Sequence, residues 1–318
     1  MNILGQDIKY GKTVLNLDIA KLHTGTPLDV PIIVQRSQKP GPTLLLTAGI
    51  HGNEVNGVEI VRQLIHKKYN IPEKGTIICI PVVNVFGFIN QERKFPDGRD
   101  LNRVFPGGKL GSLASRFAYA IMNEIIPHID YCIDFHTGGD QRFNYSQIRI
   151  DASDKETLEL AKVFGSKFVI NSPILEKSFR KSVTLLGKKI LLFEGGKSLN
   201  LDRIVTKRAI EGTLSVLHRL GFRTDKEELA AIPNVDQHYV TSSSWVRAPK
   251  SGMYRSFTKL GSFVEKNQFL GSVSDPFGGK EKSVKAPNAG YIICQNHAPI
   301  VNQGDALFHI TTEAIELK

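Results

Sequence analysis

The chain has 318 residues, a net charge of +10, 41% hydrophobic residues and 23% charged residues, a composition that excludes a disordered or fibrous protein. Its longest apolar stretch, residues 76–89, is interrupted by Pro81, Asn84 and Gly87, so we expect no membrane span and no membrane partner. Lysines and arginines are spread along the whole chain among acids, which favours a solvated basic surface over a nucleic-acid-binding one.

The first half of the chain begins with strand-like patterns. Residues 12–37 alternate apolar and polar positions, as antiparallel strands do. Residues 43–49 form a short apolar run that ends in glycine and suits a buried strand. Apolar residues at helical spacing follow from Val55 to Ile65, and residues 75–84 predict a second buried strand.

Strands and helices continue to alternate up to Gly221, which ends the last predicted helix. This alternation predicts an α/β fold with a mixed, mostly parallel sheet and helices on both faces. The remaining predicted elements are a helix over 112–126 capped by Ser112, strands over 131–136 and 147–150, a helix over 154–164, a strand over 189–194 and a helix over 202–220.

The pattern changes near residues 231–234, and helical periodicity is absent from about residue 241. A weak internal repeat relates residues 246–252 to residues 284–290, and two such β units would share a core that neither has alone. We therefore expect two domains, an α/β domain over 1–237 and a small all-β domain over 238–318.

The C-terminal segment resembles the barrel-sandwich fold of biotinyl and lipoyl domains, which carry a modified lysine in a hairpin. Here that hairpin is residues 274–282, and it lacks the usual Met-Lys-Met or Asp-Lys-Ala context. We therefore expect a structural or gating domain and not a cofactor carrier. An exposed β domain of this kind is compatible with a homo-oligomer.

Three cysteines, Cys79, Cys132 and Cys294, each lie in an apolar, strand-like run. Their odd number and their spacing argue against a disulfide framework or a cysteine metal site and predict buried free thiols. Free thiols are typical of a reducing compartment, and the N-terminal residues lack the pattern of a signal peptide. We therefore expect a cytoplasmic protein.

Polar residues follow three predicted strands at their carboxyl ends, where ligands gather in parallel sheets: His51, His136 and Glu194. Glu54 follows His51 by three residues, so both side chains can reach one metal ion from the same side of a turn. Either feature alone is common by chance. Together, two histidines and one carboxylate make a catalytic zinc set that leaves the fourth position to water.

Two further motifs add polar groups. In residues 97–107, Asn102 and Arg103 can hold a carboxylate through paired hydrogen bonds, although Asp and Arg in such a loop also pair with each other. Glu194 follows an apolar strand, where an acid is costly to bury unless it is paired or functional. Beside a metal, Glu194 could take a proton from water and pass it to a leaving amine.

The motifs G-x-H-G-N-E, D-L-N-R-x-F-P-G, D-x-H-T-G and F-E-G-G occur in one order along the chain. As a set, over residues 40–200, they resemble the succinylglutamate desuccinylase/aspartoacylase family of the zinc carboxypeptidase superfamily. The resemblance implies one Zn²⁺ per chain, held by His51, Glu54 and His136. It also implies hydrolysis of carbon–nitrogen bonds other than peptide bonds, in a small-molecule substrate with a free carboxylate.

The resemblance further implies roles for other residues. Asp100 would orient the His51 ring from behind, Asn102 and Arg103 would bind the substrate carboxylate, and Glu194 would act first as general base and then as general acid.

An arginine of the family polarises the scissile carbonyl. Arg93 is our first assignment, and Arg99 remains open because the spacing to Asn102 is longer than expected. A late tyrosine of the family matches Tyr239, Tyr254 or Tyr291, and we choose none.

The leading hypothesis is a deacylase acting on an N-acyl amino acid or a similar small molecule. A zinc carboxypeptidase acting on peptides or peptide-like tails would need the same metal and the same carboxylate-binding residues. A non-catalytic carboxylate-binding protein is disfavoured because the metal ligands and the base are retained. A nucleic-acid partner would rest on the net charge alone.

Overall fold

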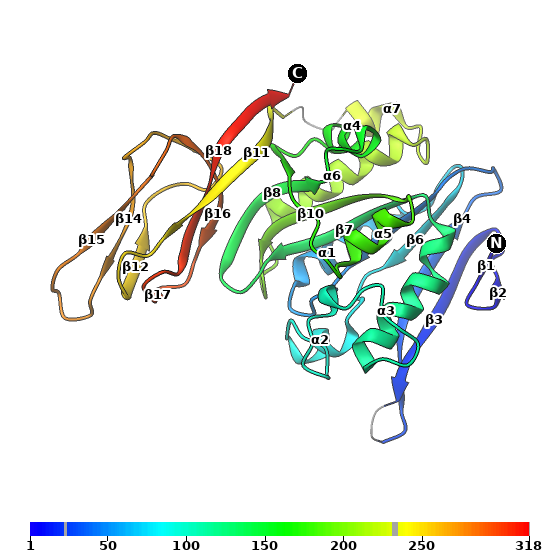
Figure 1. Ribbon diagram of the computed structural model, residues 1–318. Coiled ribbons are helices and arrows are strands. Elements are labelled where there is room, and N and C mark those ends of the chain that lie inside the picture. Colours follow the sequence, from blue (N-terminus) through cyan, green and yellow to red (C-terminus); the bar gives the residue numbers. More distant parts are fainter. Residues whose placement is uncertain (22–23, 231–234, 318) are drawn as a thin grey trace.

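The computed structural model describes residues 1–21, 24–230 and 235–317 and shows an α/β part joined to an all-β part (Figure 1). The strands of the first part are β1 (Asn2–Ile3), β2 (Gln6–Asp7), β3 (Gly11–Lys21), β4 (Pro27–Arg36), β5 (Thr43–Ala48), β6 (Thr76–Ile80), β7 (Tyr131–Gly138), β8 (Arg142–Ile150), β9 (Phe168–Asn171) and β10 (Lys189–Lys197). Its helices are α1 (Val55–His66), α2 (Val85–Asn90), the 3-10 turn η1 (Leu101–Arg103), α3 (Leu113–Glu124), the 3-10 turn η2 (Ile126–His128), α4 (Lys155–Phe164), α5 (Phe179–Leu185), α6 (Arg203–Arg219) and α7 (Lys226–Ala230).

One sheet of twelve strands runs through both parts in the order β13-β16-β18-β11-β9-β8-β10-β7-β5-β6-β4-β3. At its centre, β6, β5, β7 and β10 are parallel neighbours, while β3, β4 and β6 pair antiparallel at one side. Every residue of β5 and β6 is buried, as expected of strands covered on both faces.

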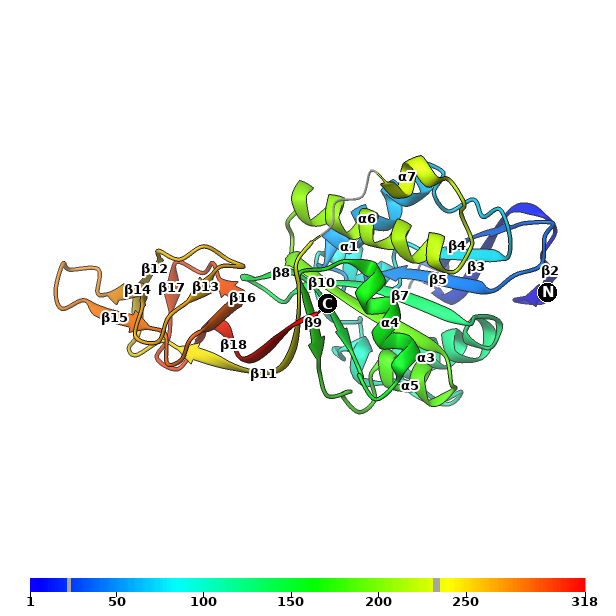
Figure 2. The same ribbon diagram turned by 90° about the horizontal axis from the view of Figure 1, so that it is seen from above.

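Helices cover both faces of this sheet (Figure 2). On one face, α1, α4 and α6 form an apolar core with residues of the central strands. The helices contribute Leu64, Phe164 and Leu217 to this core. On the other face, α3 and α5 form a second core that includes Phe117 and Phe179. The predicted α/β fold with helices on both faces is therefore confirmed, with antiparallel pairs more numerous than expected.

The predicted elements of the α/β part are present with small changes of boundary. Ser112 caps α3, since its hydroxyl accepts a hydrogen bond from the Ser115 N–H at 3.4 Å. Strand β8 begins at Arg142, earlier than the predicted 147–150, and β9 and α5 were not predicted. Those two elements have four and seven residues, which are too few to show a clear period.

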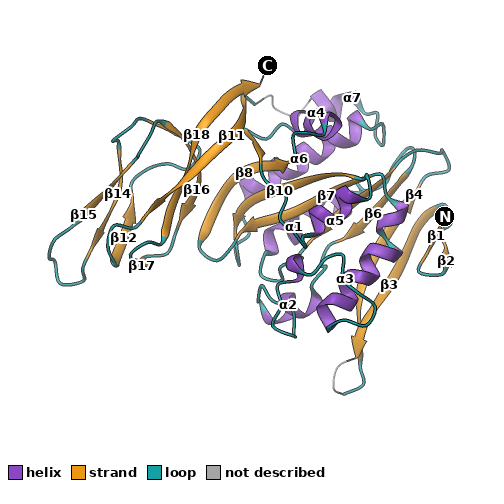
Figure 3. Ribbon diagram, viewed as in Figure 1, coloured by secondary structure: helices purple, strands orange, loops and turns teal. Residues whose placement is uncertain are grey.

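From Gln237 on, the described residues form strands and no helix (Figure 3). These strands are β11 (Gln237–Arg247), β12 (Gly252–Ser256), β13 (Phe263–Val264), β14 (Phe269–Ser274), β15 (Lys282–Lys285), β16 (Gly290–Asn296), β17 (Ile300–Val301) and β18 (Ala306–Leu317). Strands β15, β14, β12 and β17 form a four-stranded sheet, and the part has its own core around Val264, Val273 and Phe308. The division at 237/238 and the likeness to barrel-sandwich domains stay predictions.

The two parts share backbone hydrogen bonds. Strand β11 pairs parallel with β9, and β16 pairs antiparallel with β8 at Cys294 and Asn144. The second pairing places the C-terminal part against strand β8, which also neighbours β9 and β10.

The three cysteines are buried and free, as predicted. Burial raises the pKa of the Cys79 and Cys294 thiols to about 12. None of the described helices combines the length and the apolar character needed to span a membrane.

Candidate active site

The segment after β5 forms a tight turn that leads into α1. Gly49 has a φ of +65°, a conformation that glycine adopts without strain. A side chain at Gly52 would place its Cβ 1.9 Å from the backbone carbon of Gly87, so only glycine allows this turn to pack against α2. The turn carries His51, and Glu54 immediately precedes α1.

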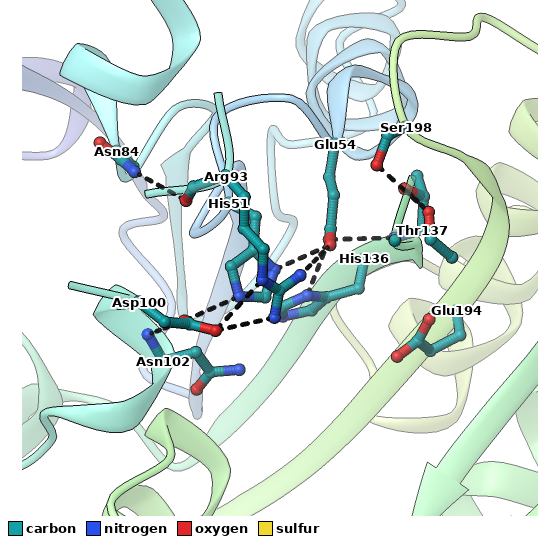
Figure 4. Close-up of polar contacts among 12 residues, drawn as sticks. His51, Glu54, Asn84, Arg93, Asp100, Asn102, His136, Thr137, Glu194 and Ser198 are labelled. Carbon is teal, nitrogen blue, oxygen red and sulfur yellow. Dashed lines mark hydrogen bonds and ion pairs between the residues drawn. The ribbon is translucent and has the colours of Figure 1, made fainter. Parts of the chain in front are cut away.

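The structure brings His51, Glu54 and His136 together, although His136 lies on β7 (Figure 4). His51 Nδ1 is 2.8 Å from Glu54 Oε1, and His136 Nδ1 is 2.9 Å from Glu54 Oε2. One possible ligand atom from each residue lies within 4.8 Å of the other two, and all three residues are buried.

A carboxylate holds each imidazole from behind. His51 Nε2 lies 3.1 Å from Asp100 Oδ1, and His136 Nε2 lies 2.8 Å from Asp134 Oδ2. Such contacts fix the ring orientation and leave Nδ1 of each histidine free to face Glu54. Asp100 therefore lies where the sequence predicted it, whereas Asp134 was missed.

These contacts set the charge of the cluster. Burial acts to lower the pKa of His51 and of His136, but the surrounding carboxylates outweigh burial and raise both pKa values. Burial acts to raise the pKa of Glu54, but the two imidazoles outweigh it and lower that pKa.

Two imidazoles and one carboxylate, each ring supported by an outer carboxylate, fit the donor set of a catalytic zinc site. The residues present therefore suit a divalent metal such as zinc.

Arg93 lies at the edge of this cluster. Its Nη1 is 3.3 Å from Glu54 Oε1, and its Nε and Nη2 donate to Asp100 Oδ2 at 3.1 and 2.9 Å. Arg99 is 54% exposed, and its nearest acid is Asp97 at 3.7 Å. Of the two arginines left open by the sequence, only Arg93 lines the pocket described below.

Asn102 and Arg103 both line the pocket and lie in η1. The Asn102 side-chain oxygen accepts a hydrogen bond from the Phe179 N–H at 2.8 Å, so its amide nitrogen is left to donate. The Arg103 Nη1 donates to the Asn102 carbonyl at 2.7 Å. This geometry suits the predicted binding of a carboxylate.

Glu194 lies on β10 beside His136 of β7, since the two residues are register partners in the parallel pair. It lines the same pocket, and its Oε2 accepts a hydrogen bond of 2.7 Å from Asn144 Nδ2. The predicted base therefore lies one strand away from a predicted metal ligand.

One cavity of about 620 Å³ is lined by His51, Glu54, Arg93, Asn102, Arg103, His136 and Glu194. The C-terminal part contributes Trp245 and Cys294 to its walls. The described lining contains no tyrosine, so none of the three tyrosines considered from the sequence lines this cavity.

Sequence reasoning missed several of the lining residues. The D-x-H spacing could have indicated Asp134, because residues two apart on a strand share a face. No comparable signal marks other missed lining residues, among them Asn144, Arg149, Arg180, Trp245 and Cys294.

Residues 40–220 match the family model of the succinylglutamate desuccinylase/aspartoacylase catalytic domain, which is more than half of the 318-residue chain. The chain belongs to the succinylglutamate desuccinylase/aspartoacylase family. A curated relative is the N-alpha-acetyl-L-2,4-diaminobutyric acid deacetylase of Halomonas elongata, 28% identical over 301 residues, covering 90% of this chain and 86% of the relative.

Solved structures of the desuccinylase/aspartoacylase type share the fold over nearly the whole chain. A succinylglutamate desuccinylase/aspartoacylase from Rhodobacter sphaeroides has a TM-score of 0.83 and 22% identity, covering 97% of each chain. The product-bound ectoine utilization protein EutE (DoeB) from Ruegeria pomeroyi has a TM-score of 0.83 and 21% identity, covering 96% of each chain. The resemblance to this family seen in the motifs is thus confirmed.

Proposed function

We propose that the protein is a zinc-dependent hydrolase that cleaves the amide bond of an N-acyl amino acid or a similar small molecule with a free carboxylate. The observation that carries the proposal is the convergence of buried His51, Glu54 and His136 with Glu194 in one cavity. The name of the Halomonas elongata relative, a deacetylase of an N-acetylated amino acid, supports the same reaction class.

His51, Glu54 and His136 would hold the metal, with Asp100 and Asp134 fixing the two rings. A bound zinc ion would supply a Lewis acid that polarises a carbonyl and lowers the pKa of water. The buried position of the ligands keeps bulk water from competing for their donor atoms.

Glu194 would accept the proton of the attacking water at its carboxylate and deliver it to the departing nitrogen. The hydrogen bond from Asn144 occupies Oε2, and Oε1 makes no hydrogen bond to the described residues. Arg93 would stabilise negative charge on the former carbonyl oxygen, since its guanidinium lies at the metal cluster. The Asn102 amide and the Arg103 guanidinium would hold the substrate carboxylate.

A small substrate suits the cavity better than a peptide tail. A volume of about 620 Å³ is typical of a small-molecule site. Trp245 and Cys294 of the C-terminal part form part of its wall and narrow the space for a longer chain. The same metal and carboxylate groups would serve a carboxypeptidase, which is therefore the alternative that the experiment must separate.

The test is a screen of the zinc-loaded protein against N-acetyl, N-succinyl and N-formyl amino acids and short peptides, with amine release as readout. We expect release from at least one N-acyl amino acid and little from peptides. Glu194→Gln should retain the metal and lose about 10²–10⁴-fold in turnover, the usual contribution of a general base. Preferential release of C-terminal residues from peptides would support the carboxypeptidase, and wild-type turnover in Glu194→Gln would refute the role of the base.

A further inference from the structure

A second, small pocket lies apart from the active-site cavity, near the junction of the two parts of the chain. It is lined by residues of β8, α4, α6 and the short segment between α4 and β9, together with Val235. None of its described lining residues lines the active-site cavity. Its volume of about 60 Å³ exceeds the roughly 10–15 Å³ that one water molecule needs, but it is far below that of a substrate site. The pocket therefore has room for a small ion.

Two cations reach this pocket without an acidic partner. Lys167 Nζ lies 6.0 Å and Arg208 Cζ lies 4.7 Å from the centre of the Tyr145 ring, so both charges gather at one side chain. Lys167 Nζ donates a hydrogen bond of 2.9 Å to the Gly261 carbonyl, which is a neutral acceptor of the C-terminal part. Neither cation makes an ion pair with a carboxylate of the described residues.

The charges around Lys167 are mostly positive. Burial, followed by the Arg208 cation, lowers the pKa of Lys167, and Lys259 acts in the same direction. Asp236 offsets only part of this effect. Cations that repel one another at a partly buried place are costly unless an anion joins them.

A buried hydroxyl adds a neutral donor to these cations. Ser146 lines the pocket and is 2% exposed, and its Oγ has no hydrogen-bond partner among the described residues. A buried hydroxyl without a protein partner indicates that another molecule supplies one. Glu211 is the acid among the described lining residues, but Lys207 Nζ lies 3.7 Å from its Oε1 and compensates its charge.

We propose that Lys167, Arg208 and the Ser146 hydroxyl form a binding site for a small oxyanion such as inorganic phosphate. An oxyanion offers several acceptor oxygens to these donors, and its charge would offset the two cations. The bound ion would sit where Lys167 contacts the C-terminal part, at the Gly261 carbonyl and 5.0 Å from the centre of the Tyr291 ring. The proposal does not depend on the reaction in the active-site cavity.

The test follows Tyr145 by fluorine NMR in zinc-loaded protein labelled with fluorotyrosine. Tyr145 lines the small pocket and not the active-site cavity, so its resonance reports on this site even if phosphate also binds at the metal. The Tyr145→Phe variant assigns the resonance among the eight tyrosines of the chain. Inorganic phosphate is titrated and compared with sodium chloride at equal ionic strength.

We expect phosphate to shift the Tyr145 resonance saturably and chloride to shift it little. Arg208→Gln should weaken phosphate binding by about tenfold or more, because a charged donor is lost, and Arg208→Lys should retain part of the affinity. Ser146→Ala should weaken binding by a smaller factor, since a neutral donor is lost. Arg203→Gln removes the same charge from an exposed position of α6 outside the pocket and should bind phosphate like the wild type.

A Tyr145 resonance that responds to phosphate no more than to chloride would overturn the site. Unchanged phosphate affinity in Arg208→Gln, or an equal loss in Arg203→Gln, would do the same, because the effect would then come from the general charge of the protein. Arg208 is exposed, so its replacement should leave the fold intact. The wild-type titration decides the matter even if a variant fails to fold.

Discussion

Asn144 donates a hydrogen bond of 2.7 Å from its Nδ2 to Oε2 of Glu194, and the backbone of Asn144 pairs with Cys294 of β16. A strand of the C-terminal part thus fixes the residue that orients the proposed base. The contact joins the two parts of the chain at the cavity.

Replacing Asn144 by alanine should lower kcat by about tenfold or more, because Glu194 would lose the donor that holds its carboxylate in a productive orientation. KM should change little, since Asn144 is not one of the groups proposed to bind the substrate carboxylate. Steady-state kinetics on the best substrate of the screen would measure both constants. A variant with unchanged kcat would show that Glu194 needs no such support.

Removing the charge of Asp134 should weaken metal binding, because this carboxylate orients His136 through Nε2 at 2.8 Å. Asp134→Asn should lower zinc affinity by about 10–100-fold, as measured by competition with a chromophoric chelator. Asp18→Asn, the same chemical change on the exposed edge strand β3, is the matched control and should bind zinc like the wild type. Equal affinities in the two variants would contradict the role assigned to Asp134.

Stability should fall as the pH falls from about 6.5 to about 4, in part because of His309. Burial lowers the pKa of this histidine to about 4, with a further contribution from Arg149, whereas the unfolded chain takes up the proton near the ordinary value of about 6.5. The unfolded state thus binds more protons in this window, which costs up to about 3 kcal/mol.

Urea unfolding at pH 7 and pH 5 would test this contribution of His309. His309→Gln should lose less stability than the wild type on going from pH 7 to pH 5, whatever its stability at pH 7. The same loss in both proteins would show that His309 titrates normally in the folded state.

Gly52→Ala should destabilise the protein by about 1–3 kcal/mol or more, because the added Cβ would lie 1.9 Å from the Gly87 carbon and 2.2 Å from the Phe88 nitrogen. The backbone between His51 and Glu54 would have to move, so zinc binding should weaken as well. Gly108→Ala is the control, since its Cβ would meet only the Ser115 hydroxyl oxygen at 3.9 Å. Thermal unfolding and metal content would be measured for both variants, and equal values would exclude a steric role for Gly52.

The sequence predicts the strands and the convergence of His51, Glu54 and His136 well because both leave local patterns. Short apolar runs such as residues 43–48, which is followed by a glycine, are typical of buried strands, and His51 and His136 follow or end such runs. The same reasoning could have identified Asp134, because it shares a face of β7 with His136.

The outer walls of the cavity could not be predicted in this way. Arg180 lies in α5, whose seven residues are too short for a helical period. Trp245 lies on β11, which is joined to the α/β part by its long-range pairing with β9, and Asn144 is fixed by the pairing of β8 with β16. These contacts depend on strand registers that no local pattern specifies.

Because the twelve-stranded sheet passes from one part of the chain into the other, the two parts are expected to unfold in a single cooperative transition. A stop codon before Gln237 would leave β9 and β8 with bare edges, which invite intermolecular pairing and aggregation. It would also open the cavity to solvent on the side of Trp245. The α/β part, which carries His51, Glu54 and His136, should therefore be produced only together with the strands of the C-terminal part that pair with its sheet.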